Sequence, residues 1–390
     1  MLARRTLICS SWALVAGLGL LAGCSKPAGG GAASAGGGET IAVGAFLSLT
    51  GSDSTFGIDT QQGIELATEQ TNAAGGVKGK KIKIVAEDDK SSPQEASIKV
   101  KQLIDRDHVV AVLGEVASSR SLAGGQVANT SHVPMITPSS TNVTVTQGKD
   151  WVFRACFTDD IQGQQAAVFA VTGQHRTKLA ILFAAQDAYS SGLAQTFRDE
   201  AKRLGATIVA DKGYQKGETN FTTYLEQIKA AAPDLVFVPN YYNDMVQIAR
   251  QAKTLGMSSA GFLGGDGWDS EDLLKGAAAE LEGSFFTNHY APDVPWPNSQ
   301  RFVADYRAKF HREPSSLAAQ GYDAAKLLYD AMTRAPDLKP ESIKNAIAST
   351  KGFQGATGTL SIDANHNAQK PLVVVRITGG KFTYFSTAGG

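Results

Sequence analysis

The sequence predicts an α/β protein whose body forms two Rossmann-like lobes, each built on a parallel sheet covered by helices. Three observations support this prediction. Roughly 350 residues follow the N-terminal segment, which is more than one hydrophobic core usually holds. Short apolar runs alternate with helix-patterned segments, as in parallel sheets whose strands are joined by helices. The two halves of the body also look like weak copies of each other.

The predicted strands are short runs rich in Val, Ile, Leu and Ala. They span 41–46, 82–87, 109–113, 133–137, 178–183, 207–210, 235–238 and 372–377. Between them, apolar residues recur at helical spacing, most clearly over 96–104, 193–204 and 245–255. Gly75, Gly76 and Gly205 stand where such helices should end.

The N-terminus has the features of a lipoprotein signal. Arg4 and Arg5 precede an apolar run over 7–21, and Cys24 follows a small-residue stretch. The run is shorter than the about 20 residues that span a bilayer. We therefore expect residues 1–23 to be a signal peptide and Cys24 to carry a lipid. The alternatives are a transmembrane anchor, or an ordinary cleaved signal in which Cys24 is incidental.

The segment that follows Cys24 is a predicted tether rather than a domain. Residues 24–40 are mostly Gly, Ala and Ser and have almost no apolar bulk, so they cannot offset the entropy cost of ordering. A signal, a lipid site and a flexible tether together predict a domain held at a membrane on its extracytoplasmic face.

Composition argues against several classes of function. Basic and acidic residues balance at 37 each without a basic patch, so nucleic acid is not an expected partner. The histidines are scattered, none at metal-ligand spacing, and no nucleophile has an identifiable base. The glycine-rich run 75–80 lacks P-loop spacing. We therefore expect no enzyme, no metal site and no cofactor. Cys156 lies among apolar residues and is expected to be a buried hydrophobe.

Two hydroxyl-rich loops follow neighbouring predicted strands of the first half. The strand 109–113 leads into a loop with Ser118 and Ser119, and the strand 133–137 leads into 138–142. Both serines fall at an expected helix start, where amide groups and a hydroxyl suit a carboxylate. A simple helix cap is the alternative for either serine. Two such loops at one sheet edge are harder to explain by capping alone.

The strand-end loops of the second half carry an acidic residue and would suit a cation. The strand 235–238 leads into a loop with Tyr241, and the run 261–263 leads into 264–269, where Asp266 stands between glycines. Asp266 could accept hydrogen bonds from an ammonium group; the alternative is a turn Asp that bonds its own backbone. One wall thus suits an anion and the other a cation. An α-amino acid zwitterion requires both, because either charge buried without a partner is costly.

Each half also places one aromatic residue just past its first strand, Phe56 in the first and Tyr189 in the second. Ligands of open α/β sheets bind at those edges. The two rings would face each other across a cleft. The loops alone support equally well the alternative that each ring packs at its helix start.

In this order, the motifs resemble those of the leucine/isoleucine/valine-binding protein family, type I periplasmic binding proteins that serve ABC transporters. The resemblance covers nearly the whole body and includes the loop around Tyr189. The motifs, specific only as a set, are IAVGAFLSLTG, NAAGGVKGKKIKIVAEDD, GEVASS, ITPSSTN, RACFTDDIQG, NYYND and GFLGGDGWDS.

The resemblance implies a role for each polar candidate. Ser118 and Thr141 would hold the ligand carboxylate through hydroxyl and amide groups. Ser139 would offer its backbone carbonyl to the ligand ammonium, and Asp266 would pair with that ammonium from the second lobe.

The resemblance also implies a hinge. Phe56, Tyr189 and Tyr241 would line the pocket and close over the ligand. The chain would cross between the lobes three times, near 156–158, Tyr290 and 358–360. The N-terminal lobe would then comprise 41–156 plus 291–358, and the C-terminal lobe 157–290 plus 359–390.

The chain departs from the family pattern at three points. The cysteine pair of the first lobe is missing, Asp266 stands where Glu is frequent, and Phe56 stands where Tyr or Trp is frequent. The last two changes leave the ligand open: a branched-chain or other apolar amino acid is expected, and amides, urea and aromatic acids are alternatives.

The function implied is that of a monomeric, lipid-anchored periplasmic protein that captures an amino acid by hinge closure and delivers it to an ABC permease. A ligand-sensing receptor of the same fold is the main alternative. A hydrolase lacks a nucleophile with a base, and a DNA-binding regulator conflicts with the secretion signal.

Overall fold

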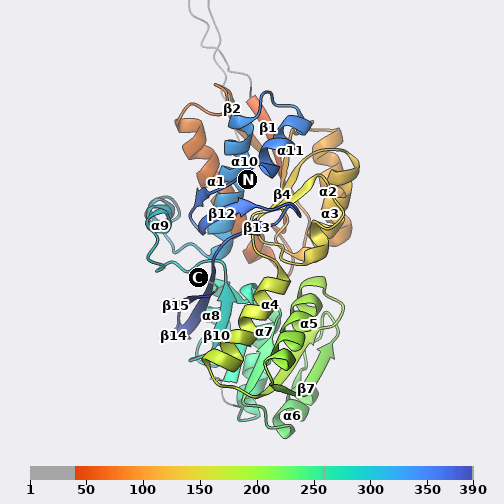
Figure 1. The fold of residues 1–390 in the computed structure, drawn as a ribbon, viewed down its shortest axis with the longest axis vertical. Coiled ribbons are helices and arrows are strands. Elements are labelled where there is room, and N and C mark those ends of the chain that lie inside the picture. The colour runs from red at the N-terminus through yellow and green to blue at the C-terminus, as the bar shows by residue number, and fades with distance from the viewer. Residues whose placement is uncertain (1–39, 258–260, 389–390) are drawn as a thin grey trace, which may run out of the picture. The chain divides into compact units, whose positions relative to one another are not determined.

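The computed structural model describes residues 40–257 and 261–388, which belong to one structural unit (Figure 1). The expected signal peptide, the lipid site at Cys24 and residues 24–39 of the expected tether lie outside the described residues. Among the described residues, no helix is long and apolar enough to cross a membrane.

The first sheet is entirely parallel, with the order β2-β1-β3-β4-β5. Its strands are β1 (Thr40–Leu47), β2 (Lys81–Asp88), β3 (Val112–Leu113), β4 (Met135–Thr137) and β5 (Val152–Arg154). Its helices are α1 (Ser54–Ala73), α2 (Pro93–Asp105) and α3 (Ser118–Thr130). Val43 and Ala45 of β1 pack toward α1, whereas Phe46 packs toward α2 and α3, because successive side chains alternate between faces.

The second sheet has the order β15-β14-β10-β9-β8-β6-β7. Its strands are β6 (Lys178–Ala184), β7 (Thr207–Tyr214), β8 (Leu235–Val238), β9 (Phe262–Gly264), β10 (Phe285–Asn288), β14 (Leu372–Thr378) and β15 (Lys381–Ala388). Strands β6 to β10 are parallel, as expected. Strand β14 runs antiparallel to β10, and β15 antiparallel to β14. Gly379 and Gly380, at φ 58° and 71°, form the two-residue turn of this unexpected hairpin.

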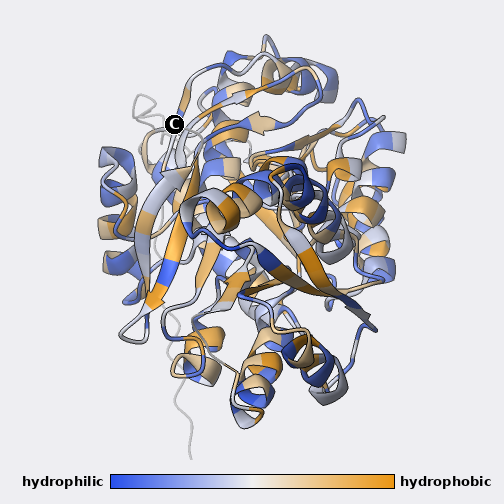
Figure 2. Ribbon diagram, turned by 60° about the horizontal axis from the view of Figure 1, so that its bottom comes forward, coloured by the Kyte–Doolittle hydropathy of each residue, from blue (hydrophilic) through white to orange (hydrophobic). Residues whose placement is uncertain are grey.

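Helices cover both faces of the second sheet. They are α4 (Asp159–Val168), α5 (Ala188–Arg203), α6 (Thr222–Ala230), α7 (Tyr242–Thr254) and α8 (Glu271–Ala277). Leu179 and Ile181 of β6 pack with α4 and α5, and Ala180 and Leu182 face the core shared with α6, α7 and α8. Orange recurs along the strands in Figure 2, and the surrounding helices alternate orange and blue, as amphipathic helices on a buried sheet should.

A third group of elements lies beside the first sheet. It contains α9 (Pro297–Phe310), α10 (Ser316–Arg334), α11 (Pro340–Ala348) and a small sheet of β11 (Phe353–Gly355), β12 (Gly358–Ile362) and β13 (Ala368–Gln369). Helices α1 and α10 approach closely: a Cβ at Gly63 would lie 1.9 Å from the Ala318 carbonyl oxygen, and a Cβ at Gly321 would lie 2.4 Å from that of Thr60. Only glycine allows this contact.

The hydrogen bonds around the small sheet bear on the lobe boundary. The Arg154 amide of β5 donates to the His366 carbonyl at 3.0 Å, and Thr146 Oγ1 donates to Asn367 Oδ1 at 2.8 Å. These contacts attach β12 and β13 to the first sheet. We therefore propose a third crossing at Lys370 and Pro371, just before β14, rather than at 358–360.

Candidate functional site

The seven candidate ligand-binding residues surround one cavity. Phe56, Ser118, Ser139, Thr141, Tyr189, Tyr241 and Asp266 all line it, together with Val116, Gly267 and Leu317. The cavity is small, with a volume of only about 10 Å³. The walls are therefore close together.

One end of the cavity is the N-terminus of α3. Ala117 occupies the N-cap position and no side chain caps the helix, so Ser118 and Ser119 are helical residues rather than caps. Ser118 is buried, and its hydroxyl accepts a hydrogen bond from the Asn142 amide at 3.2 Å. An uncapped helix start with a buried hydroxyl is suited to an anion, since the first-turn amides point outward and carry partial positive charge.

The loop after β4 forms the adjacent wall. Thr137 Oγ1 donates to the Glu115 carbonyl at 2.6 Å, and Ser140 Oγ donates to the Val116 carbonyl at 2.9 Å, so the loops after β3 and β4 are tied together. Thr141 Oγ1 is buried and has no hydrogen-bonding partner in the described parts of the chain. A buried hydroxyl without a partner is costly, so a ligand atom at this place would stabilise the site.

The opposite wall carries Asp266, at the start of a short 3-10 helix (Asp266–Trp268) that follows β9. The residue is only 6% exposed. Gln162 Nε2 donates to Oδ1 at 2.9 Å, and His289 Nε2 lies 3.1 Å from Oδ2. Burial lowers the pKa of His289 to about 4, so the ring is neutral at neutral pH, and its Nε2–H is the group that can donate to the carboxylate.

Asp159, which the sequence analysis did not select, is a second acid near Asp266. It opens α4, is buried, and neither of its carboxylate oxygens has a hydrogen-bonding partner among the described residues. Burial raises the pKa of Asp159 well above its ordinary value. The nearby Thr141 hydroxyl lowers this pKa, although it does not meet the geometry of a hydrogen bond. The negative charge of Asp266 raises the pKa of Asp159 further. A cation bound between the two acids would relieve this unfavourable arrangement.

Aromatic side chains close the cavity. Tyr189 and Tyr241 stack with ring centroids 5.1 Å apart, and Phe56 meets Tyr241 edge-on at 5.7 Å. Phe56 also meets Tyr242 at 4.9 Å. The Tyr189 hydroxyl accepts from the Gly267 amide at 3.1 Å, whereas the Tyr241 hydroxyl is buried and has no partner within the described residues. The rings from the two halves thus pack against each other across the cavity.

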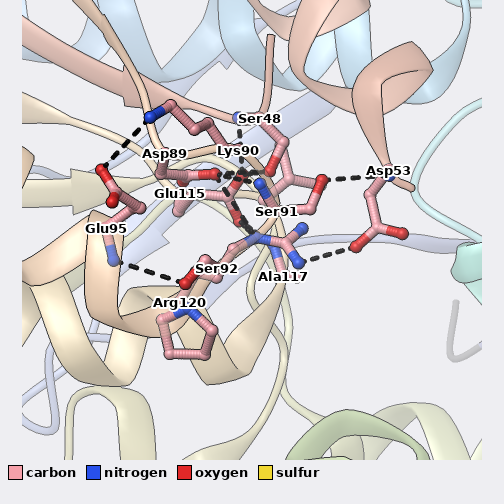
Figure 3. Close-up of polar contacts among 12 residues, drawn as sticks. Ser48, Asp53, Asp89, Lys90, Ser91, Ser92, Glu95, Glu115, Ala117 and Arg120 are labelled. Carbon is pink, nitrogen blue, oxygen red and sulfur yellow. Dashed lines mark hydrogen bonds and ion pairs between the residues drawn. The ribbon is translucent and has the colours of Figure 1, made fainter. Parts of the chain in front are cut away.

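A buried ionic cluster holds the first wall in place. Arg120 of α3 lies between Asp53 on one side and Asp89 and Glu115 on the other (Figure 3). Its Nη1 is 2.6 Å from Asp53 and its Nε is 2.9 Å from Glu115. Asp53 directly precedes α1, which carries Phe56, and Glu115 lies in the loop between β3 and Ser118. One arginine therefore fixes two loops that line the cavity.

Sequence reasoning missed several neighbours of the cavity, namely Val116, Asp159, Gln162, Gly267, His289 and Leu317. Val116 and Gly267 lie close to Ser118 and Asp266 in the motifs GEVASS and GFLGGDGWDS, and Asp159 and Gln162 belong to the motif RACFTDDIQG, so the motifs were an available signal. His289 and Leu317 lie in segments without such a signal and reach the site only through the tertiary fold.

Comparison with known proteins places this geometry in a family. A family model described as periplasmic binding protein matches residues 40–381. The chain belongs to the periplasmic binding protein family. It is 30% identical over 352 residues to a Leu/Ile/Val-binding protein homolog of Brucella abortus, covering 88% of this chain and 93% of the relative.

Two solved structures support the same family. The leucine-binding protein LivK of Thermotoga maritima is 35% identical, with a TM-score of 0.85, over 89% of this chain and 98% of that chain. The branched-chain amino acid binding protein LivJ of Streptococcus pneumoniae, solved with isoleucine, is 32% identical, with a TM-score of 0.84, over 90% of this chain and 99% of that chain.

These matches confirm the predicted resemblance to the leucine/isoleucine/valine-binding proteins and the predicted two-lobe α/β fold. The relatives are substrate-binding proteins by their names, which confirms that the chain is a binding protein and not an enzyme. Membership of this family implies an extracytoplasmic location.

Proposed function

We propose that the protein captures an α-amino acid with an apolar side chain and delivers it to an ABC permease. The observation that supports this most directly is the pairing of two unlike ends in one buried cavity: an uncapped helix N-terminus with hydroxyls, and the Asp266 carboxylate. Each end alone fits many ligands. Both together fit a zwitterion, whose charges would otherwise be buried without partners.

The ligand carboxylate would lie at the start of α3, accepting from the Ser118 hydroxyl, the first-turn amides and Thr141 Oγ1. The ammonium would lie against Asp266, with the Ser139 carbonyl as a further acceptor and Asp159 as a second negative group nearby. This placement supplies partners for the buried Thr141 hydroxyl and for Asp159, which have none among the described residues.

The remaining lining supports an apolar side chain. Phe56, Val116 and Leu317 contribute apolar surface to the cavity. The relatives named for leucine, isoleucine and valine favour the same class. The contacts leave the choice among these amino acids open, because a pocket separates side chains differing by a methylene by only ~1–3 kcal/mol.

We propose hinge closure as the means of capture. Hydrogen bonds that join the proposed lobes near the cavity include three side-chain contacts: Thr55 Oγ1 to Asp272 at 2.5 Å, the Tyr242 hydroxyl to the Ser52 carbonyl at 3.1 Å, and Asn142 Nδ2 to the Ala188 carbonyl at 2.6 Å. Opening the hinge would break all three. Ligand bridging the walls favours the closed state, which the permease would recognise.

The N-terminal features complete the proposal: residues 1–23 direct export, Cys24 carries the lipid, and residues 24–40 tether the monomeric domain to the membrane. In the full-length precursor, Cys24→Ser should abolish incorporation of labelled palmitate. Incorporation by that variant would show that Cys24 is not the lipid site.

The test of ligand class is a thermal-shift and calorimetric screen. The chain from Gly38 onward, unfolded and refolded to remove carried-over ligand, is titrated with leucine, isoleucine, valine, amides, urea and benzoate. A ligand at 100 times its dissociation constant should add about 2.7 kcal/mol of stability. Leucine, isoleucine or valine should stabilise the protein, and Asp266→Asn should abolish most of that effect. Stabilisation by urea or benzoate instead, or an unchanged affinity in Asp266→Asn, would refute the zwitterion model.

A further inference from the structure

His289 occupies a position that connects the proposed ammonium site to the hinge. It directly follows β10 and precedes Tyr290, the second proposed crossing. The side chain is fully buried, and its Nε2 lies 3.1 Å from the Asp266 carboxylate. Its other ring nitrogen, Nδ1, has no hydrogen-bonding partner in the described residues, so the contact with Asp266 is its polar contact there.

Two of the three proposed crossings meet at this ring, which directly precedes the second of them. Phe157, on the first crossing, stacks on His289 with ring centroids 3.7 Å apart and an interplanar angle of 23°. Lys370, on the third crossing, is close enough for its charge to contribute to the low pKa of His289. The imidazole therefore packs against the first proposed crossing and directly precedes the second.

The loop that carries Asp266 is fastened to β10 at both ends. His289 holds Asp266 at its start, and Asn288 Nδ2 donates to Asp269 at its end at 2.7 Å. Asp269 also accepts from the Ser316 amide of α10, in the proposed N-terminal lobe, at 2.9 Å. The direction of the Asp266 carboxylate is thus determined by residues beside the second crossing together with Gln162 of α4.

We propose that His289 is a positioning residue for ligand recognition, which aims the Asp266 carboxylate at the ligand ammonium and makes that aim depend on the arrangement of the hinge. This inference rests on the proposed function. The side chain of Asp266 is shorter than that of the Glu expected from the family resemblance. The direction of its carboxylate therefore matters more for reaching the ligand ammonium. Gln162 fixes one carboxylate oxygen and His289 the other, which leaves the remaining lone pairs for the ligand.

The test separates the two contacts of the ring. His289→Phe keeps a ring that can stack on Phe157 but removes the donor to Asp266. His289→Gln keeps a donor near the Nε2 position but removes the ring. His366→Phe is the matched control, because His366 also stacks on a phenylalanine, Phe153, at 4.1 Å, but its ring nitrogen faces backbone carbonyls.

Affinity is measured by calorimetry for two probes, leucine and 4-methylpentanoate, which has the same carbon skeleton without the ammonium. His289→Phe should weaken leucine binding by about 10-fold or more, as expected for loss of a hydrogen bond to a charged group, and leave 4-methylpentanoate nearly unchanged. His289→Gln should recover most of the leucine affinity, and His366→Phe should match the wild type. Equal weakening for both probes, or no change for leucine, would overturn the proposal.

A measurement without ligand tests the role of His289 independently of the proposed function. The ¹⁵N–¹H spectrum of the histidine rings should show His289, assigned by its absence in His289→Gln, as a neutral ring protonated at Nε2. Asp266→Asn should shift its signals more than those of any other histidine. A wild type that binds no leucine but gives this spectrum would contradict the proposed ligand alone; the opposite tautomer would contradict the role of His289.

Discussion

Replacing Arg120 by methionine tests whether the buried ionic cluster holds the first wall of the site. Arg120 is fully buried and lies within 3 Å of carboxylates of Asp53 and Glu115, at 2.6 and 2.9 Å. Removing it leaves uncompensated buried charge, for which the usual cost is ~3–5 kcal/mol. With an unfolding entropy of about 2 cal/mol/K per residue over roughly 350 residues, this corresponds to a loss of about 4–7 °C in melting temperature.

The matched control is Arg203→Met. Arg203 also forms a two-pronged contact with a carboxylate, that of Glu200, but its side chain is 68% exposed. Differential scanning calorimetry should show a clear loss for Arg120→Met and almost none for Arg203→Met. Adding Glu115→Gln to Arg120→Met should restore part of the loss, since one buried charge is then removed. Equal, small losses in both single variants would refute the reasoning.

Three further outcomes follow from the structure. Burial and the neighbouring Glu115 raise the pKa of Asp89 to about 7. The contribution of Asp89 to stability is therefore full below its unfolded pKa of about 4 and is lost as pH rises through about 7. The free energy of unfolding measured with urea should show this loss in the wild type and not in Asp89→Asn. Burial raises the pKa of the Cys156 thiol to about 12, so in the chain from Gly38 it should resist thiol reagents until urea unfolds the protein, and rapid labelling of the folded state would contradict this. Tyr242→Phe removes the hydroxyl bond to Ser52 across the proposed lobes and should weaken leucine binding about fivefold. Tyr322→Phe, which removes a hydroxyl bond to Gln70 of α1, should not weaken it.

The strand-end loops could be predicted because each of them is recognised from a short segment of sequence. A strand ends, a loop carries polar residues, and all such loops meet at one edge. That reasoning selects Ser118, Asp266 and the loop 138–142, within which the family resemblance names Thr141. The fold brings Ser118, Thr141 and Asp266 to one cavity. Their contacts with a ligand stay a prediction. Whether Ser118 caps α3 or lies in its first turn could not be predicted, because a shift of one residue in the start of the helix changes the answer.

Other features depend on contacts between distant segments. Strand β5 has only three residues and β10 has four, too short for a clear period. A hydrogen bond between the Arg154 amide and the His366 carbonyl attaches the small sheet β11–β13 to β5. No local sequence pattern predicts this contact. His289 has the appearance of a scattered histidine in the sequence, and its contact with Asp266 spans 23 positions.

The two walls of the site are made rigid by different means, and this suits a protein that must close on its ligand. Arg120 joins Asp53 and Glu115, which restrains the loops around Phe56 and Ser118. The Asp266 loop is restrained by the segment beside the second crossing instead. If each wall is fixed within itself, ligand binding need not order loops, and most of the conformational cost is concentrated in the hinge. A ligand with only one of the two charges then engages one wall and gains less from closure, so it should bind more weakly than a zwitterion.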